Sequence, residues 1–206
     1  MLIDVTQVGK LGMSYIKGAP TLKVEKVKCF ESTEKEYATT FFSGAVHNSG
    51  THIDTMSVIE IELDRLIRKG IKFDVSHIEN RPIELRDLDL SMIEEGIYVF
   101  FQTNWDRYLD DEKKYQDHPE ISIEVINYLI DKKVNMVGID ALGFGRGKNH
   151  RFIDNLFADN NIYGIENLTN LSKIPDKDFK VYCMPIKIEK LDALPTRILV
   201  EFFNIK

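Results

Sequence analysis

The chain has few cysteines and no long apolar run, and both absences narrow the kinds of protein it can be. Cys29 and Cys183 are its two cysteines among 206 residues, and they form no CxxC pair. Each stands in an apolar, strand-like context, so we expect two free buried thiols in a reducing cytoplasm. No apolar stretch approaches the roughly 18 residues of a membrane span. Because Met1–Val5 also lacks the features of a signal peptide, we expect a cytoplasmic protein with no membrane partner.

Basic clusters, low-complexity tracts and internal repeats are also absent. Lys and Arg number 27 against 33 Asp and Glu, which gives a net charge of −6. Phosphate backbones select basic surfaces, so we expect no nucleic-acid partner. The composition, 43% hydrophobic and 29% charged, is that of a globular protein. With no linker in sight, we interpret residues 1–206 as a single domain.

Residue periodicity predicts a mixed α/β domain in which the sheet dominates. Segments rich in β-branched and aromatic residues are typical of strands, and we expect strands at Leu22–Phe30, Glu36–Val46, Ile71–Val75, Ile97–Gln102, Val134–Ile139, Ile162–Glu166, Phe179–Ile188 and Arg197–Phe203. Apolar residues at the helical period predict helices over Glu62–Lys69, Ile123–Lys133 and Arg151–Asn160. Ser122 is the expected N-cap of the second helix.

The segment 47–54, His-Asn-Ser-Gly-Thr-His-Ile-Asp, is the most informative stretch, since it holds two imidazoles and a carboxylate within eight positions. Side chains alternate along a strand, so His52 and Asp54 are expected on one face. A nitrogen and an oxygen ligand that converge in this way suit an ion such as Zn²⁺ or Mn²⁺. The alternative is a strand end whose polar residues are merely solvated.

The first ligand of this segment stays open, because the strand register does not decide it. His47 has the wrong parity for the face of His52 and Asp54, whereas Asn48 has the right one. His47 can join the site only if the strand bulges before Gly50. Gly50 itself would let the backbone pass close to a bound ion or substrate, and Thr51 could hold a supporting hydrogen bond.

Two later segments also carry candidate residues. Glu166 follows an apolar run and either ends a strand at a cleft or decorates the surface. The loop 143–148, Gly-Phe-Gly-Arg-Gly-Lys, superficially suggests a phosphate-binding loop of a nucleotide-binding module. It fits neither GxGxxG nor GxxxxGK[ST], which favours a flexible active-site lid. His77 and His118 have no ligand-like neighbours, and we expect His118 to be structural.

Together, these segments resemble the cyclase family of metal-dependent hydrolases, which includes bacterial kynurenine formamidase. The resemblance rests on HxxGTHID at 47–54, VGIDAL at 137–142 and IENLTNL at 165–171, in that order. Shorter similarities at 3–6, 17–20, 74–76, 102–105 and 118–119 extend it over nearly the whole chain. It implies a swivelling β/β/α domain with a mixed, sheet-rich core and flanking helices. Such a protein is usually a homodimer that hydrolyses an amide, ester or lactone with bound Zn²⁺ or Mn²⁺.

The family's HxGTHxDxPxH motif carries over only in part. His52 and Asp54 match two metal ligands, and Asp54 would bridge two metals. The first His of the motif falls on Asn48, one position after His47. The Pro and the final, catalytic His have no counterpart, because the chain runs from Asp54 through 55–58 directly into the next apolar segment. The resemblance also makes Trp105 a plausible pocket wall.

At the second metal, Glu166 matches the family, but the His expected one helix earlier aligns with Asp154. His150 lies four residues upstream, on the same face if the helix extends that far. A site of His52, Asp54, Asp154 and Glu166 is rich in oxygen and favours Mn²⁺, Mg²⁺ or Ca²⁺ over Zn²⁺. Its three carboxylates repel one another unless a cation neutralises them.

The leading hypothesis is therefore a metal-dependent hydrolase of the cyclase type, acting on a small amide, ester or lactone. The alternative is a non-catalytic member of the same fold that binds a small molecule or a protein partner. The expected site consists of His52, Asp54, Glu166, Asp154 and His47 as metal ligands, of Glu166 and His150 as groups that move protons, and of Asn48, Thr51 and Trp105 around them.

Overall fold

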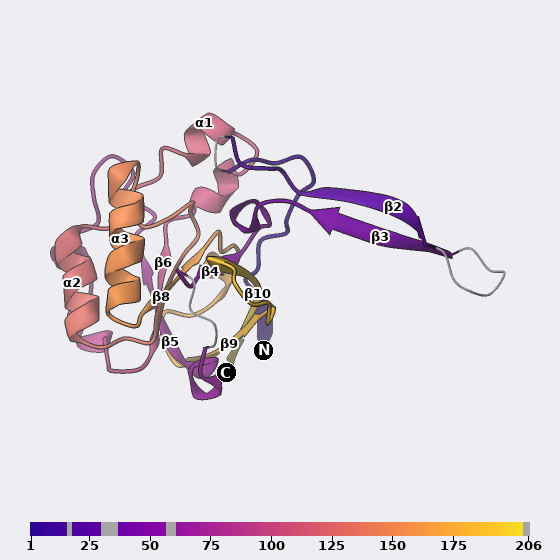
Figure 1. Cartoon of the computed structure of the whole chain (residues 1–206). Coiled ribbons are helices and arrows are strands. Elements are labelled where there is room, and N and C mark those ends of the chain that lie inside the picture. Colours follow the sequence, from indigo (N-terminus) through magenta and orange to yellow (C-terminus); the bar gives the residue numbers. More distant parts are fainter. Residues whose placement is uncertain (16–17, 30–36, 57–60, 204–206) are drawn as a thin grey trace.

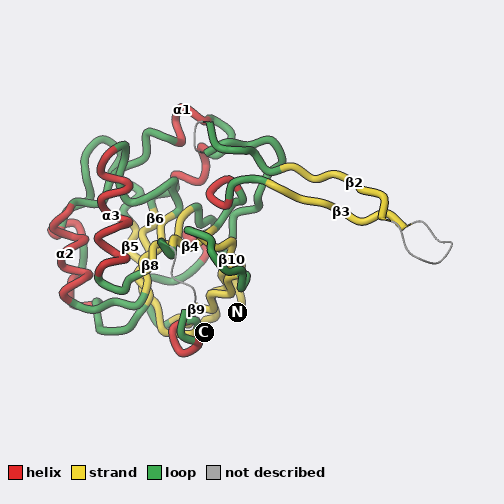
Figure 2. The backbone as a smooth tube through the Cα atoms, viewed as in Figure 1, coloured by secondary structure: helices red, strands yellow, loops and turns green. Residues whose placement is uncertain are grey.

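Strands that close into a barrel form the centre of the molecule in a computed structural model, which describes residues 1–15, 18–29, 37–56 and 61–203 (Figures 1 and 2). In order around the ring, the seven described strands are β10 (Ala193–Phe202), β4 (His52–Asp54), β8 (Tyr163–Glu166), β7 (Met136–Ile139), β6 (Tyr98–Gln102), β5 (Ile67–Asp74) and β9 (Phe179–Pro185). The ring closes because β9 pairs with both β5 and β10. Strand β1 (Leu2–Asp4) adds to β10 outside the ring. Neighbours from β5 to β8 run parallel, and the other pairs are antiparallel.

The helices are few, and two of them cover one outer side of the barrel. Helices α2 (Ile123–Asp131) and α3 (Lys148–Asp159) lie side by side there, and the short α1 (Glu112–Tyr115) lies nearer the N-terminal segment (Figure 1). The predicted N-cap is confirmed, because the Oγ of Ser122 accepts a hydrogen bond from the Val125 amide at 3.3 Å. None of the helices in the described ranges is long and apolar enough to cross a membrane.

Strand β6 shows how the barrel separates two hydrophobic cores. Its side chains alternate, so Tyr98 and Phe100 join one cluster while Val99 and Phe101 join the other. The core that contains Val99 and Phe101 also includes the apolar residues of α2 and α3, so it lies between the helices and the barrel. The core that contains Tyr98 and Phe100 includes residues from six strands of the ring and fills the barrel interior. The side chain of Ile53 points into the barrel interior, so the side chains of the residues on either side of it in β4 point outward.

The predicted helix Glu62–Lys69 is wrong. A short 3₁₀ helix at Leu63–Arg65 leads directly into strand β5, which begins at Ile67. Leu63 is 81% exposed, whereas Arg65 is buried, its guanidinium donating to the Asn135 and Asn161 oxygens at 2.8–2.9 Å. The helical spacing of apolar residues here did not mark a buried face, because backbone pairing with β6 and β9 determines the conformation.

The other predicted helices and strands are present, with shifted ends. The predicted strand to Val46 ends at Ser43, and β9 ends at Pro185 rather than Ile188. Strand β10 begins at Ala193, earlier than predicted, because its first residues pair with β4. Cys183 is a free buried thiol, as expected, while the side chain of Cys29 lies outside the description. Lys17, Phe30, Glu36 and the predicted direct connection 57–60 also lie outside the described residues.

Strands β2 (Lys23–Cys29) and β3 (Tyr37–Ser43) form a two-stranded arm that projects from the barrel (Figures 1 and 2). Among the described strands they pair with each other alone. The arm exposes apolar side chains, with Val24 at 48%, Val27 at 41%, Phe41 at 52% and Phe42 at 68%. After β3 the chain continues into the 3₁₀ helix Val46–Asn48, which contains His47.

Candidate metal centre

The pairing of β4 with β8 places the central residues. His52 lies opposite Glu166, and Asp54 lies opposite Gly164. Because Ile53 and Ile165 point into the barrel interior, the side chains of His52, Asp54 and Glu166 share the outer face. The expectation that His52 and Asp54 lie on one face is therefore met, with His52 Nε2 3.7 Å from Asp54 Oδ1.

His47, His52 and Asp54 form a first cluster. His47 Nε2 lies 3.2 Å from Asp54 Oδ1, and the two imidazole rings meet edge to face with centroids 5.0 Å apart. One potential ligand atom from each residue lies within 4.8 Å of the others. His52 is fully buried, and the His47 side chain remains 23% exposed. At these distances, one cation could be bound by all three side chains.

The parity of His47 does not exclude it, because Val46–Asn48 is a 3₁₀ helix rather than a strand. The side chain of Asn48, which has the correct strand parity, serves a different purpose. Its Oδ1 accepts from the Tyr15 amide at 2.7 Å, and its Nδ2 donates to the Pro20 carbonyl at 3.1 Å. Asn48 therefore anchors the preceding segments, and His47 takes the position beside Asp54.

His150, Asp154 and Glu166 form a second cluster. His150 and Asp154 stand one turn apart on α3, with Nε2 3.4 Å from Oδ2. The same Nε2 lies 3.7 Å from Oε1 of Glu166. Glu166 also connects the clusters, since its Oε2 is 3.5 Å from His52 Nε2. The structure thus brings together every imidazole and carboxylate that the sequence nominated.

Among the residues that the structure describes, three buried acceptor atoms in these clusters find no hydrogen-bond partner. They are His52 Nε2, Asp54 Oδ2 and Glu166 Oε1. His52 Nδ1 lies 2.9 Å from the carbonyl oxygen of Gly50, so Nδ1 carries the proton and Nε2 presents its lone pair. His150 Nδ1 makes the same contact with the Gly145 carbonyl at 3.2 Å. Such backbone contacts orient imidazoles that bind metals.

Burial dominates the electrostatics of the carboxylates. It raises the pKa of Asp154 to about 7 and, with the charge of Asp54, raises the pKa of Glu166 well above its ordinary value. Burial also acts to raise the pKa of Asp54, but the hydrogen bond from His47 and the charge of His52 bring that pKa below its usual range. The charge of Glu166 raises the pKa of His150. The site concentrates negative charge that a bound cation would neutralise.

The donor set fits a divalent transition metal. Three imidazoles and three carboxylates suit Zn²⁺ or Mn²⁺ better than Ca²⁺, which takes oxygen ligands alone. Orphaned buried acceptors carry an energetic cost that coordination would remove. The residues present therefore fit one or two metal ions.

Gly143 is a site residue that sequence reasoning missed. A Cβ at this position would lie 2.5 Å from the His150 ring and 2.8 Å from Oε1 of Glu166. The loop 143–148 is not an open lid over its first residues, because Phe144 is fully buried against Phe157. The loop instead packs against His150 and holds it. Its glycine content was visible in the sequence, but only the fold shows what the glycines meet.

Gly50 has a different role from the one expected. Its φ of +95° favours glycine, and a Cβ would lie 2.5 Å from the carbonyl oxygen of Gln7. The close approach is therefore to the N-terminal segment rather than to an ion. Thr51 supports the site as expected, since its Oγ1 accepts from the Gln7 amide at 2.7 Å and donates to the Asn167 carbonyl at 2.5 Å.

The remaining nominated residues lie apart from the two clusters. Trp105 is 1% exposed in the helix-side core, where its indole N–H donates to the Lys114 carbonyl at 3.0 Å. His118 is buried, and burial lowers its pKa to about 4. His77 is exposed. Asp140, in the VGIDAL segment, accepts from the amides of Thr103 and Asn104 and thereby holds the loop after β6.

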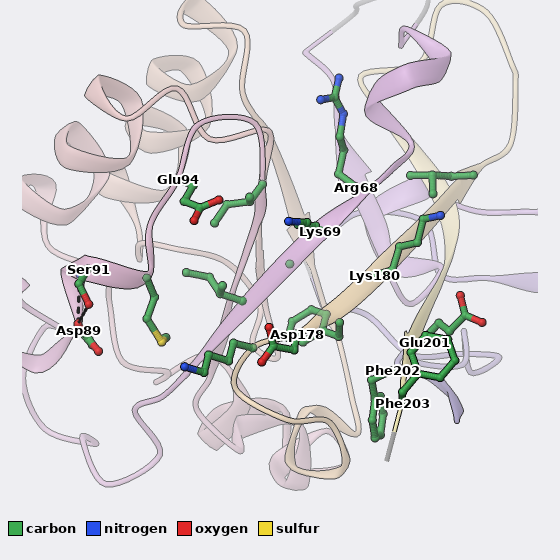
Figure 3. A pocket seen from close by; sticks show the side chains of 17 residues that line it. Arg68, Lys69, Asp89, Ser91, Glu94, Asp178, Lys180, Glu201, Phe202 and Phe203 are labelled. Carbon is green, nitrogen blue, oxygen red and sulfur yellow. Dashed lines mark hydrogen bonds between the residues drawn. The ribbon is translucent and has the colours of Figure 1, made fainter. Parts of the chain in front are cut away.

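A wide cleft of 870 Å³ lies elsewhere on the molecule (Figure 3). Strands β5 and β9 line it together with Glu94 and Phe203. Its basic residues, such as Arg68 and Lys180, are matched by acidic ones, such as Asp178 and Glu201. None of the six clustered imidazole and carboxylate residues lines this cleft, so the candidate chemistry does not depend on it.

Known proteins share both sequence and fold with this chain. Residues 3–146 match the cyclase family model, described as "Putative cyclase". An isatin hydrolase of Roseibium aggregatum is 25% identical over 228 residues, which cover 94% of this chain and 86% of that protein. The structure of isatin hydrolase A from Ralstonia solanacearum is similar in fold, with a TM-score of 0.81, 21% identity and coverage of 97% and 91%.

A further solved structure, of a potential metal-dependent hydrolase with cyclase activity, is 27% identical, with a TM-score of 0.76 and coverage of 97% and 96%. These similarities agree with the order of the motifs and with the barrel that brings them together. Because the family match covers most of its length, the chain belongs to the cyclase family.

Proposed function

We propose that this protein is a Zn²⁺- or Mn²⁺-dependent hydrolase that acts on a small amide, ester or lactone. The observation that carries the proposal is that neighbouring side chains of His52, Asp54 and Glu166 each hold a buried acceptor atom with no partner in the described part of the chain. Two clusters of possible ligands surround these atoms. Similarity to a potential metal-dependent hydrolase with cyclase activity supports the same reaction class.

His47, His52 and Asp54 would hold one metal, and Asp154 and Glu166 would supply ligands to a second. A metal bound here would polarise the acyl carbonyl and lower the pKa of water. The family's catalytic His has no counterpart, so we assign proton movement to His150 and Glu166. The His150 Nε2 lies 3.7 Å from Glu166 Oε1 and 3.4 Å from Asp154 Oδ2, within reach of both carboxylates after a small adjustment.

Metal content provides the test. Protein purified without chelators or an affinity tag is expected to contain one or two equivalents of Zn or Mn by plasma mass spectrometry. Asp54→Ala is expected to abolish that content, whereas Asp159→Ala, an exposed carboxylate on the same helix as His150, is expected to preserve it. Metal-loaded protein is then assayed with amides, esters and lactones, isatin first because of the isatin hydrolase relative. Metal-free protein that takes up neither ion would contradict the proposal.

Two features of the sequence favour the non-catalytic alternative. Asp154 stands where the family motif has an imidazole, and the motif's last His has no counterpart in the sequence. A protein that binds stoichiometric metal and hydrolyses none of the three substrate classes would favour this alternative, a binding protein for a small molecule or a protein partner.

We also propose a homodimer formed through the arm β2–β3. A two-stranded ribbon alone is marginally stable in water, and this one exposes Phe41 and Phe42 away from the barrel. Exposed apolar surface of this kind is typical of an interaction site.

We further propose the swivelling β/β/α arrangement, which membership of the cyclase family supports. We also propose a cytoplasmic location, which the free thiol of Cys183 supports.

A further inference from the structure

Asn167 carries a buried donor that metal binding alone does not explain. Its side chain is fully buried, and its Nδ2 has no hydrogen-bond partner among the described residues. The other unpartnered buried atoms, on His52, Asp54 and Glu166, are acceptors and suit a cation. An amide N–H is a donor, so it requires an acceptor such as an oxygen atom.

Backbone hydrogen bonds fix the position of Asn167. The residue directly follows Glu166 and adopts a left-handed conformation with φ of +56°. Its carbonyl accepts from Thr51 Oγ1 at 2.5 Å, and Thr51 directly precedes His52. Its amide donates to the Ala141 carbonyl at 2.9 Å. Asn167 thus adjoins Glu166 in sequence and is tied to Thr51, the neighbour of His52.

A tyrosine fixes the side-chain amide as well. The hydroxyl of Tyr115 donates to Oδ1 of Asn167 at 2.7 Å, and Tyr115 is 2% exposed. Tyr115 packs against the ring of Tyr15, whose amide is held by Asn48 beside His47. Because Tyr115 holds the amide oxygen, the NH₂ group is the end of the side chain that meets no acceptor within the described ranges.

We infer that Asn167 donates a hydrogen bond from Nδ2 to the acyl oxygen of the substrate, with Tyr115 as its positioning residue. The inference rests on the proposed hydrolase function. In the reaction the oxygen of water bonds to the acyl carbon, and the carbonyl electron pair moves onto the acyl oxygen. The pair then returns as the bond to the leaving nitrogen or oxygen breaks, and that atom takes the proton that water gives up. A fixed donor at the acyl oxygen stabilises the charge that develops there.

The test uses formate, a small anion with carboxylate oxygens, titrated into Co²⁺-loaded protein and followed by the visible absorption of the metal. Wild-type protein is expected to bind both. Asn167→Gly suits the positive φ and removes the donor without adding charge. It is expected to weaken formate binding by about tenfold or more while the affinity for Co²⁺ stays within about threefold. Tyr115→Phe is expected to give a smaller loss of formate affinity, because it frees the amide to rotate.

Asn170→Gly is the matched control. Asn170 also has a positive φ, of +58°, in the same loop, but its Nδ2 already donates to the Asp4 carbonyl. It is expected to bind Co²⁺ and formate as the wild type does. If Asn167→Gly does not fold, Asn167→Ala also removes the amide donor without adding charge, and it is read in the same way.

The outcomes separate this inference from the proposed function. Asn167→Gly that binds formate as tightly as the wild type, or wild-type protein that binds Co²⁺ but no formate, would overturn the role of Asn167 alone. Wild-type protein that takes up no Co²⁺ would overturn the metal centre and the inference together. Weakened formate binding with unchanged Co²⁺ affinity supports both.

Discussion

His52 and Glu166 face each other across neighbouring strands, with Nε2 of the imidazole 3.5 Å from Oε2 of the carboxylate. The contact belongs to neither metal cluster alone, since His52 is grouped with His47 and Glu166 with His150. The register of β4 against β8 therefore sets the distance between the two candidate metal sites. Substitutions at positions that control this arrangement give the sharpest tests.

His47 and Asn48 are expected to give opposite results. His47→Ala removes an imidazole 3.2 Å from Asp54 and should weaken Zn²⁺ or Mn²⁺ binding with little loss of stability. Asn48→Ala should cost about 1–3 kcal/mol in the free energy of unfolding, because the buried Tyr15 amide loses its partner and the Pro20 carbonyl keeps only the Ala45 amide. Calorimetric metal titration and urea unfolding measure the two effects. Loss of metal in Asn48→Ala with native stability would reverse the assignment.

Gly143→Ala is expected to damage the second cluster. The added methyl group would meet the His150 ring at 2.5 Å and Glu166 at 2.8 Å, so one of them must shift and metal affinity should fall. Gly147→Ala in the same loop is the control. It meets no atom within 4 Å but has φ of +55°, so it should cost about 1 kcal/mol of stability and leave metal binding intact. The metal affinities of both variants are measured by titration. If Gly143→Ala binds metal as tightly as Gly147→Ala, the loop does not position the ligands.

Asp154 should make the stability of the metal-free protein depend on pH. Its pKa of about 7 in the folded protein exceeds the ordinary value of 3.8, so its contribution is present below about pH 4 and is lost as the pH rises through 7. Between pH 5 and 8 the Tm in excess EDTA should fall. Asp154→Asn should reduce that fall, by about 2–4 °C for each kcal/mol removed. Asp159→Asn is the exposed control, and equal pH profiles for all three proteins would refute the assignment.

The arm should control the oligomeric state. Phe42→Asp places a charge on an apolar side chain that is 68% exposed, and we expect dissociation to monomers in sedimentation velocity. Leu63→Asp alters an even more exposed apolar residue, at 81%, in the 3₁₀ helix before β5, and should leave the assembly unchanged. A Phe42→Asp protein that sediments as the wild type would exclude the arm as the interface.

The sequence predicted those parts of the site that depend on local periodicity. The alternation of β4 places His52 and Asp54 on one face, and the helical period places His150 and Asp154 together on α3. Both relationships hold within a single strand or helix, so neighbouring residues suffice to predict them. The family motifs added Glu166, which lies far along the chain.

Other features depend on contacts that no local pattern encodes. His47 reaches Asp54 because the Pro20 carbonyl accepts hydrogen bonds from the Ala45 amide and from Asn48, which stabilises a 3₁₀ helix rather than a bulged strand. The segment Glu62–Lys69 has a helical period, but its last residues belong to barrel strand β5, which is held by long-range pairing with β9. Asn167 and Gly143 matter only because distant side chains meet them.

The short strand β4 contributes three residues to the barrel, between β10 and β8. Its imidazole and carboxylate belong to a segment more than a hundred residues away from Glu166, so the two clusters meet only where β4 pairs with β8. An ion shared by these ligands would link the two strands directly. Chelation should then let β4 and β8 separate more readily, which is measured as faster amide exchange along both strands.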